Sequence, residues 1–391
     1  MKKKNNLGLL LHIILGILAG IAIGFTGNEV LIRIFATFSS IFGNLLKFTV
    51  PLLILAFITN GIAQLGGNSG KILFATIMLA YVSSIFAGFL AFFVNSNVFP
   101  YILSNMSIGV LDPHSSLSAY FTIDMPPVLS VTSSLVLAFI LGVGLSKMND
   151  SSVLKKSTYD FFVIIENFIT KVIIPLLPIH IVGIFATMTQ SGQLFTIMGT
   201  FGKVFLLVIA LHFTALMIQY AVAGIYAKKN PLECIKNMLP AYFAALGTQS
   251  SAATIPITIQ QMKQNGIRNN IAEFTAPLCA NIHLSGSAIT LTTCAMAILK
   301  LQGTEIPFSS MAGFIMMLGL MVVAAPGIPG GAVMASLGIL ESMLGFSPEM
   351  LSLMIALYIA QDSFGTALNV TGDGAIALII DRHDQQLVVS K

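Results

Sequence analysis

Apolar runs long enough to cross a lipid bilayer recur along almost the whole chain. About 20 apolar residues in a helix span the ~30 Å of hydrocarbon in a membrane. Of the 391 residues, 56% are hydrophobic and only 9% are charged, which is not typical of a soluble domain of this size. The sequence therefore predicts an all-α polytopic membrane protein, with its regular spans at 7–27, 31–63, 72–95, 128–147, 157–189 and 197–227.

Basic residues are distributed unevenly between the two sides of these spans. Segments 96–130 and 188–196 contain none. Most of the 19 basic residues lie in the alternate loops and at the termini: Lys2, Lys3, Lys4, Lys71, Lys147, Lys155, Lys156, Lys228, Lys229, Lys236, Lys263, Arg268, Arg382 and Lys391. The positive-inside rule then predicts that both termini, including the tail 382–391, are cytoplasmic and that 96–130 lies outside. The net charge of +4 reflects this topology and does not indicate a nucleic-acid partner.

The ends of the chain and its cysteines give two smaller expectations. The N-terminal apolar run is too long for a signal peptide and no small-residue cleavage site follows it, so we expect a retained first helix. Cys234, Cys279 and Cys294 show no paired spacing and predict neither a disulfide framework nor a metal motif.

Between 230 and 381 the pattern of regular spans changes. The stretches "ALGTQSSAATIPITI" (245–259) and "VVAAPGIPGGAVMASLGIL" (322–340) each place Gly, Ser, Thr or Pro between two short apolar arms. Non-helical backbone at membrane depth is tolerated where it is buried in protein or lines a wet cavity. Paired interruptions of this kind point to a transporter binding site. We predict two re-entrant helical hairpins, the alternative being helices kinked at proline.

Each predicted hairpin is followed by a span with a polar interruption of its own. These spans contain "APLCANIHLSGSAITL" (276–291) and "LMIALYIAQDSFGTALNVTGDGAIALII" (353–380). The order hairpin, broken helix, hairpin, broken helix predicts an inverted repeat.

The second of these spans carries two acids that are costly to keep in a membrane, at roughly 2.5–3.5 kcal/mol for a charge at mid-bilayer. Four polar residues spaced four, three and four apart share one helix face: Asp362, Thr366, Asn369 and Asp373. Gly372 weakens the helix and is expected to free carbonyl oxygens. Carbonyls with one carboxylate suit a small cation such as sodium, and the other carboxylate suits an ammonium group. The alternative is two acids paired with bases, but Lys300 is the only base near the apolar parts of this region.

Four motifs together resemble the dicarboxylate/amino acid:cation symporter family, which includes glutamate transporters and bacterial serine/threonine:sodium symporters. They are "TQSSAATIP", "PLCANIHLSGS", "GIPGG" and "DSFGTALNVTGD". The likeness covers nearly the whole chain in helix order, and "QDS…TALN" is most similar to the serine/threonine branch.

This resemblance implies a fold of eight transmembrane helices plus two re-entrant hairpins, assembled as a homotrimer in the bacterial cytoplasmic (inner) membrane. Residues 1–229 would be mainly the trimerisation scaffold, with the third and sixth helices moving with the transport core. Residues 230–381 would form that core.

The resemblance also implies residue roles. Asp362 would bind the substrate ammonium, and Asn369 with the backbone at Ser250, Ser251 and Gly327 would bind its carboxylate; Thr366 would contact the side chain. Asp373 would ligate one sodium together with carbonyls near Cys279, His283 and Asn369. Carbonyls around Val322, Val323 and Ala325 would form a second sodium site.

Departures from the family pattern bear on specificity. Gly365 stands where acidic-substrate carriers have an arginine that pairs with the substrate side chain, and Gln249 replaces the arginine of the first hairpin tip. These two replacements favour a small neutral L-amino acid as the substrate.

Other departures affect a third sodium site that is present in the family's carriers of acidic substrates. His283 and Ser285 replace an Asn and an Asp, and the helix-3 contribution falls on Tyr81, Ser83 or Ser84 in an ambiguous register. We do not expect a third sodium. His283 keeps three interpretations: a packed histidine, a cation ligand through its carbonyl, or a group that binds a proton.

The predicted function is sodium-coupled secondary active uptake of a serine- or threonine-like amino acid by alternating access. Coupling to protons or another cation, with another small carboxylate or amino acid as substrate, is the alternative. An ion channel is less consistent with a single compact acid cluster. An intramembrane enzyme would need Ser251 and His283 to act as nucleophile and base, and nothing in the sequence places them together.

Overall fold

The computed structural model describes residues 7–64, 70–103, 117–149, 151–192, 194–304, 307–323, 325 and 330–389. In these ranges the regular structure is helical, with no strand. Six segments of the described chain are long and apolar enough to cross a membrane: Glu29–Asn60, Ile72–Ile102, Val153–Gln190, Phe201–Ala227, Asn269–Leu301 and Pro348–Gln385. These findings confirm the all-helical, polytopic architecture, while the count of eight crossings stays a prediction.

Each regular span predicted for the first half corresponds to a helical segment. The segments are α1 (Leu7–Phe25), α2 (Glu29–Gln64), α3 (Gly70–Ile102), α4 (Val131–Ser146), α5 (Val153–Phe168), η1 (Ile169–Ile173), α6 (Ile174–Gln190) and α7 (Leu194–Ala227). The main difference is α3, which continues to Ile102 instead of ending at 95.

The segment from α5 to α6 contains a π-helical turn, η1, directly before Pro175. Proline has no N–H, and its ring crowds the carbonyl four residues earlier, which here belongs to Lys171. A π turn is wider than an α turn and relieves this crowding. The chain therefore passes the proline without ending the helical segment.

The second half forms two helical hairpins and two long helical segments. Its helices are α8 (Pro231–Thr248), α9 (Ser251–Gln264), α10 (Asn269–Ile282), α11 (Ser285–Leu301), α12 (Phe308–Val323), α13 (Gly331–Leu344) and α14 (Pro348–Val389). The hairpins are α8 with α9 and α12 with α13, whose helices pack against each other. Their re-entrance into a membrane stays a prediction.

The turns of both hairpins lie where the sequence places them. In the first, Gln249 adopts φ 53°, and Ser250 Oγ accepts a hydrogen bond from the Ala253 N–H at 3.3 Å, which begins α9. Of the second turn, the described residues are Ala325 and Gly330. Gly330 has φ 77°, a conformation that glycine adopts without strain, and α13 begins immediately after it.

One of the two predicted helix interruptions is present and the other is not. The first span breaks at His283 and Leu284, between α10 and α11. The second was expected to open near Gly372, but α14 is continuous from Pro348 to Val389. A glycine costs a helix only about 1 kcal/mol, and burial of this segment against neighbouring helices offsets that cost. The expected freeing of carbonyls at Gly372, and the strict repeat of broken helices, are therefore wrong.

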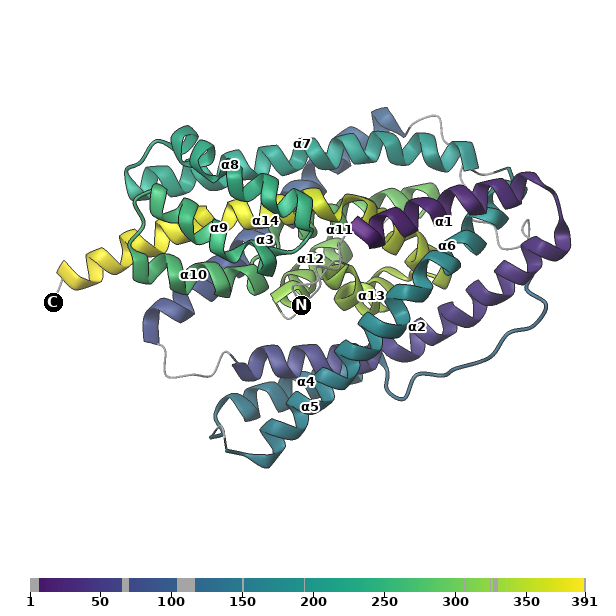
Figure 1. Ribbon diagram of the computed structural model, residues 1–391, viewed down its shortest axis with the longest axis horizontal. Helices are drawn as coiled ribbons and strands as arrows, with labels where there is room; N and C mark the ends of the chain where they lie inside the picture. The colour runs from purple at the N-terminus through teal and green to yellow at the C-terminus, as the bar shows by residue number, and fades with distance from the viewer. Residues whose placement is uncertain are drawn as a thin grey trace.

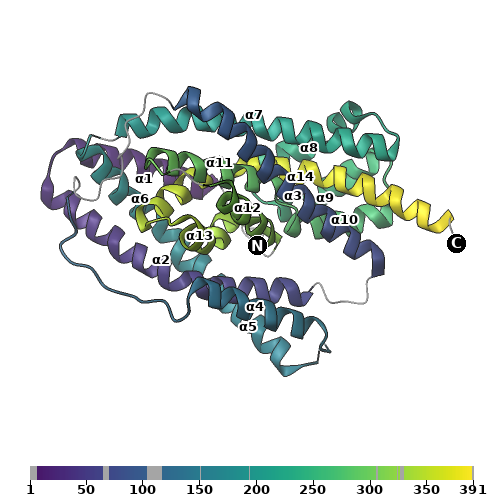
Figure 2. The same cartoon turned by 180° about the vertical axis from the view of Figure 1, so that it is seen from behind.

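The helices form two groups. Helices α1, α2, α4, α5 and α6 pack on one another, with α1 against α6 and α2 against α4. Helix α14, yellow in Figure 1, runs along the long axis beside α7, α8, α9 and α10. In Figure 2, which shows the opposite side of the molecule, α3 crosses α10, α11 and α12. In this packing α3 and α7 contact the second half of the chain.

An ion-pair cluster fixes α10 relative to α14. Arg268, directly before α10, donates from Nε to Asp381 Oδ1 at 2.7 Å and from a terminal nitrogen to Asp384 Oδ2 at 2.8 Å. Both acids lie near the end of α14. The cluster helps to set the register at which the break after α10 meets the polar face of α14.

Candidate functional site

The polar residues of α14 form one buried stripe inside the second half of the chain. Asp362, Thr366, Asn369 and Asp373 are all at most 6% exposed. The stripe faces the interrupted segment between α10 and α11 and the beginning of α13. Among the described residues, its hydrogen bonds to other elements are with residues 283–287, at the break and the start of α11, and with Gly330 before α13.

Asp362 is held at the start of α13. Its Oδ2 accepts a hydrogen bond from the backbone N–H of Gly330 at 2.8 Å. Tyr358 and Thr366, each about one turn away on α14, flank this carboxylate. A carboxylate accepts hydrogen bonds, which is what the N–H groups of an ammonium require.

Asn369 is held at the start of α11. Its Oδ1 accepts the Gly286 N–H at 2.7 Å, and its Nδ2 donates to Ser287 Oγ at 3.4 Å. The Ser287 and Tyr358 hydroxyls are 2.8 Å apart, which connects the surroundings of Asn369 to those of Asp362. The two residues predicted to bind the two ends of an amino acid therefore lie in one polar network.

Asp373 contacts the helix break itself. Its Oδ1 lies 2.9 Å from His283 Nδ1, and both side chains are at most 1% exposed. His283 Nε2 lies 3.0 Å from Ser83 Oγ of α3. His283 is therefore a packed histidine whose two ring nitrogens both have partners. Its carbonyl and proton-binding roles stay predictions.

The first hairpin supplies two further candidates. Ser250 caps α9 through Ala253, and the Ser251 carbonyl accepts the Thr254 hydroxyl at 2.8 Å. Helix α9 packs against α14. Contact of Ser250 and Ser251 with the substrate carboxylate stays a prediction.

Cys279 and Val322 lie near the ends of α10 and α12 and their carbonyls have backbone partners, whereas Asn369 lies inside the continuous α14. The Cys279 carbonyl accepts the His283 N–H at 2.9 Å, and the Val322 carbonyl accepts the Ala325 N–H at 3.2 Å. Val323 is the last residue of α12. Gly327 lies outside the described residues.

Gly365 lies against the start of α11 and not in an open space. A Cβ at Gly365 would be 3.6 Å from the Gly286 carbonyl carbon and 3.7 Å from the Ser287 nitrogen, which is ordinary contact. An alanine fits this position, whereas a larger side chain has to extend past the start of α11.

Several members of the network are not evident from the spacing on α14. Gln219 of α7 donates from Nε2 to Ser83 Oγ and to Ser285 Oγ, both at 3.0 Å. The sequence carries a signal for it, because Gln219 is an isolated amide in the apolar run "TALMIQYAVAG". The ambiguous register of α3 is resolved: Ser83 faces His283, while the Tyr81 hydroxyl donates to the Met316 carbonyl at 3.3 Å.

The donor set fits an alkali cation better than a transition metal. Within the described ranges no three His, Cys, Asp or Glu side chains are grouped as metal ligands, and Cys234, Cys279 and Cys294 are buried and free. The Asp373 carboxylate is in contact with the His283 ring, and further hard oxygen donors at this place, which sodium prefers, stay a prediction.

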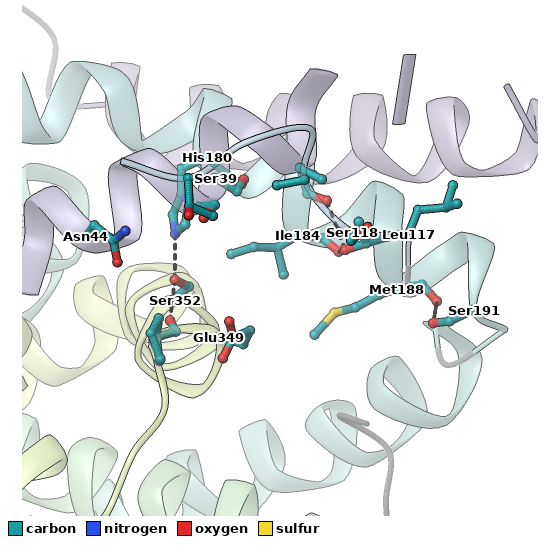
Figure 3. A pocket seen from close by; sticks show the side chains of 17 residues that line it. Ser39, Asn44, Leu117, Ser118, His180, Ile184, Met188, Ser191, Glu349 and Ser352 are labelled. Atoms are coloured by element: carbon teal, nitrogen blue, oxygen red, sulfur yellow. Dashed lines mark hydrogen bonds between the residues drawn. The ribbon is translucent and has the colours of Figure 1, made fainter. Parts of the chain in front are cut away.

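A pocket of about 350 Å³ lies elsewhere, between α2, α6, the segment 117–122 and the start of α14. Figure 3 shows His180 of α6 pointing at Ser352 of α14, with His180 Nε2 and Ser352 Oγ 2.5 Å apart. None of the described candidate site residues lines this pocket. It marks a boundary between the two groups of helices and is separate from the polar stripe.

Comparisons with known proteins agree with the motifs that meet at this stripe. The sequence matches the sodium:dicarboxylate symporter family over residues 9–383. It is similar to the serine/threonine transporter SstT of Acinetobacter baumannii (strain AYE), with 25% identity over 98% of both chains. It is 26% identical to the SstT of Streptococcus agalactiae serotype III over 97% of this chain and 95% of that protein, and 28% identical to that of Streptococcus suis over 85% and 94%. The chain is thus a membrane transporter and not an enzyme, and it belongs to the sodium:dicarboxylate symporter family.

Proposed function

We propose that the chain is a sodium-coupled symporter that imports a small neutral L-amino acid, such as serine or threonine, by alternating access. The observation that carries this proposal is the buried stripe of α14, in which Asp362 and Asp373 face the start of α13 and the break after α10. Two buried acids to which the described residues bring no Lys or Arg partner suit a cationic group and a cation as ligands. The bacterial SstT relatives support the same substrate class.

The proposed protein is a homotrimer in the bacterial cytoplasmic membrane, with both termini cytoplasmic. It has eight transmembrane helices and two re-entrant hairpins. Residues 1–229 form mainly the scaffold, and 230–381 form the transport core. The packing of α3 and α7 against the second half supports their motion with that core.

In the proposed substrate site Asp362 binds the ammonium group. Asn369 and the backbone of the two hairpin tips, at Ser250, Ser251 and Gly327, bind the carboxylate. The Thr366 hydroxyl contacts the substrate side chain. Backbone N–H groups at helix starts suit an anion, because they carry partial positive charge and lack helical partners.

In the proposed sodium site Asp373 supplies the negative charge, and carbonyls near Cys279, His283 and Asn369 supply neutral ligands. A second sodium would bind carbonyls at the end of α12, around Val322, Val323 and Ala325. One carboxylate and several dipoles balance one monovalent ion, whereas carbonyls alone leave its charge uncompensated.

Specificity for a neutral substrate follows from the absence of a cation for a second carboxylate in this part of the site. Burying an unpaired charge is costly. Gly365 has no side chain, Thr366 is neutral, and the first hairpin tip carries Gln249. Asp362 would repel an additional carboxylate, so serine, threonine or alanine fit better than aspartate or glutamate.

Uptake by the purified protein in liposomes tests this function. We expect labelled serine or threonine to enter when a sodium gradient, but not a potassium gradient, is imposed. Unlabelled neutral amino acids compete, aspartate and glutamate do not, and counterflow of labelled substrate distinguishes a carrier from a channel. Tight aspartate binding, or uptake that ignores sodium, would contradict the proposal.

The second candidate function is a symporter in which proton entry drives the uptake of a small neutral amino acid or of another small carboxylate. It is favoured by the 2.9 Å contact between His283 Nδ1 and Asp373 Oδ1, since an imidazolium there would occupy the place of a cation. Uptake driven by a pH gradient in sodium-free buffer would support this candidate over sodium coupling.

A further inference from the structure

Gln219 connects three helices around the proposed sodium site. From α7 its Nε2 donates to Ser83 Oγ on α3 and to Ser285 Oγ at the start of α11, each at 3.0 Å. The next residue, Tyr220, donates its hydroxyl to the Thr371 carbonyl of α14 at 2.7 Å. This part of α7 is therefore bonded to α14 next to Gly372 and also to α3 and α11.

Gly372 leaves the space that Gln219 and His283 occupy. A Cβ at Gly372 would be 2.7 Å from Gln219 Oε1 and 2.9 Å from His283 Cε1, both too close for ordinary contact. The amide and the imidazole thus pack together against the bare backbone of α14, next to Asp373. A glycine in the middle of a helix is explained here by close approach and not by a helix break.

The direction of the hydrogen bonds follows from the number of available hydrogens. The NH₂ group of a glutamine can only donate, so Ser83 Oγ accepts from Gln219. The single hydrogen of the Ser83 hydroxyl is then free to be donated to His283 Nε2, 3.0 Å away. An Nε2 that accepts leaves the ring hydrogen on Nδ1, which donates to Asp373 Oδ1.

We propose that Gln219 is a positioning residue of the coupling-cation site. By donating to Ser83 it directs the Nδ1–H of His283 toward Asp373, and this hydrogen bond orients the carboxylate for a sodium ion. The inference rests on the proposed function, because it assigns to Gln219 a part in sodium affinity.

Two substitutions of similar size test this role in the full-length protein. Gln219→Glu replaces the donor by acceptors, so Ser83 must donate to position 219 and accept from His283 Nε2. Gln219→Met removes both donor and acceptor. Gln261→Met is the matched control, because Gln261 is a buried glutamine of α9 that lies outside the network.

We expect the sodium concentration for half-maximal uptake to rise roughly 3- to 10-fold in Gln219→Met, the scale of one hydrogen bond. The KM for serine at saturating sodium should change less than twofold. NMR of ¹⁵N-histidine-labelled protein, with His283 assigned by His283→Asn, should show a hydrogen on Nδ1 in the unmodified protein and on Nε2 in Gln219→Glu. The Gln261→Met control should keep the sodium dependence of the unmodified protein.

Unchanged sodium dependence in folded Gln219→Met, or an unchanged His283 tautomer in Gln219→Glu, would overturn the inference. Folding is checked by size-exclusion chromatography and thermal melting without sodium. A failure of the proposed function is distinguishable, because the unmodified protein would then show no sodium dependence. If the unmodified protein depends on sodium and the variants match it, only the role of Gln219 is refuted.

Discussion

Replacing Asp373 by asparagine removes the charge of the proposed sodium site while keeping its shape. The amide oxygen of the asparagine can still accept a hydrogen bond from His283 Nδ1, which lies 2.9 Å from Asp373 Oδ1 in the unmodified protein. Two unit charges about 4 Å apart attract by about 4 kcal/mol at an effective dielectric constant of ~20. The amide dipole recovers part of this, so we expect Asp373→Asn to lose roughly 2–4 kcal/mol of sodium binding, about 30- to 1000-fold in affinity. Without sodium the variant should be no less stable, since a neutral amide is easier to bury than a carboxylate.

Thermal melting in detergent measures this difference directly. Sodium at about 100 times its Kd stabilises a protein by about 2.7 kcal/mol. A 30-fold loss of affinity reduces this at the same concentration to about 0.9 kcal/mol, and a larger loss abolishes it. The difference between melting curves in NaCl and in KCl should therefore correspond to about 2.7 kcal/mol for the unmodified protein and to about 0.9 kcal/mol or less for Asp373→Asn. Equal sodium stabilisation in both, with sodium-driven uptake retained, would refute the assignment of Asp373.

The other predictions address the substrate and the packing of the site. Asp362→Asn should lose at least about 1.5 kcal/mol of amino-acid binding free energy, the scale of a charge-assisted hydrogen bond, while sodium binding without substrate should change less. Equal losses of amino-acid and sodium binding in calorimetry would mean that the two acids form one site. Gly372→Ala should weaken sodium binding and lower the free energy of unfolding by about 1–3 kcal/mol, because the added Cβ would lie 2.7 Å from Gln219 Oε1. Gly202→Ala is the control and should melt like the unmodified protein, because no atom lies within 4 Å of its Cβ. Gly365→Arg should shift competition in uptake assays toward aspartate, and Gly365→Ala, which fits beside Gly286, should not; an Arg variant that folds and still excludes aspartate would count against the specificity argument.

The sequence predicts the main helices well because long apolar runs and periodic spacing are local properties. The face shared by Asp362, Asn369 and Asp373 follows from helix geometry alone, and all three are buried together in the structure. The break at His283 is likewise evident from its polar surroundings. The continuity of α14 through Gly372 is not, since a glycine weakens a helix by an amount that tertiary packing easily offsets.

The partners of the stripe depend on contacts between distant helices, which spacing along one helix does not contain. The contact between Ser83 and His283 joins residues 200 positions apart, and that between Gln219 and Ser285 joins residues 66 apart. Gln219 stands out as a lone amide in an apolar span, but its partners do not follow from that. For the same reason the register of α3 stays ambiguous until the helices are packed.

The stripe of α14 also suggests how two solutes can be coupled. Asp362 is bonded to Gly330 at the start of α13, Asn369 to Gly286 at the start of α11, and Asp373 to His283 at the break after α10. Each proposed ligand group thus connects α14 to a different chain segment, and two of those segments lie next to one another at the break. In the proposed sites, a cation bound to Asp373 would fix the break, and the break positions the start of α11 that holds Asn369. Sodium binding would then organise part of the amino-acid site, and by linkage the amino acid would raise the affinity for sodium by the same factor.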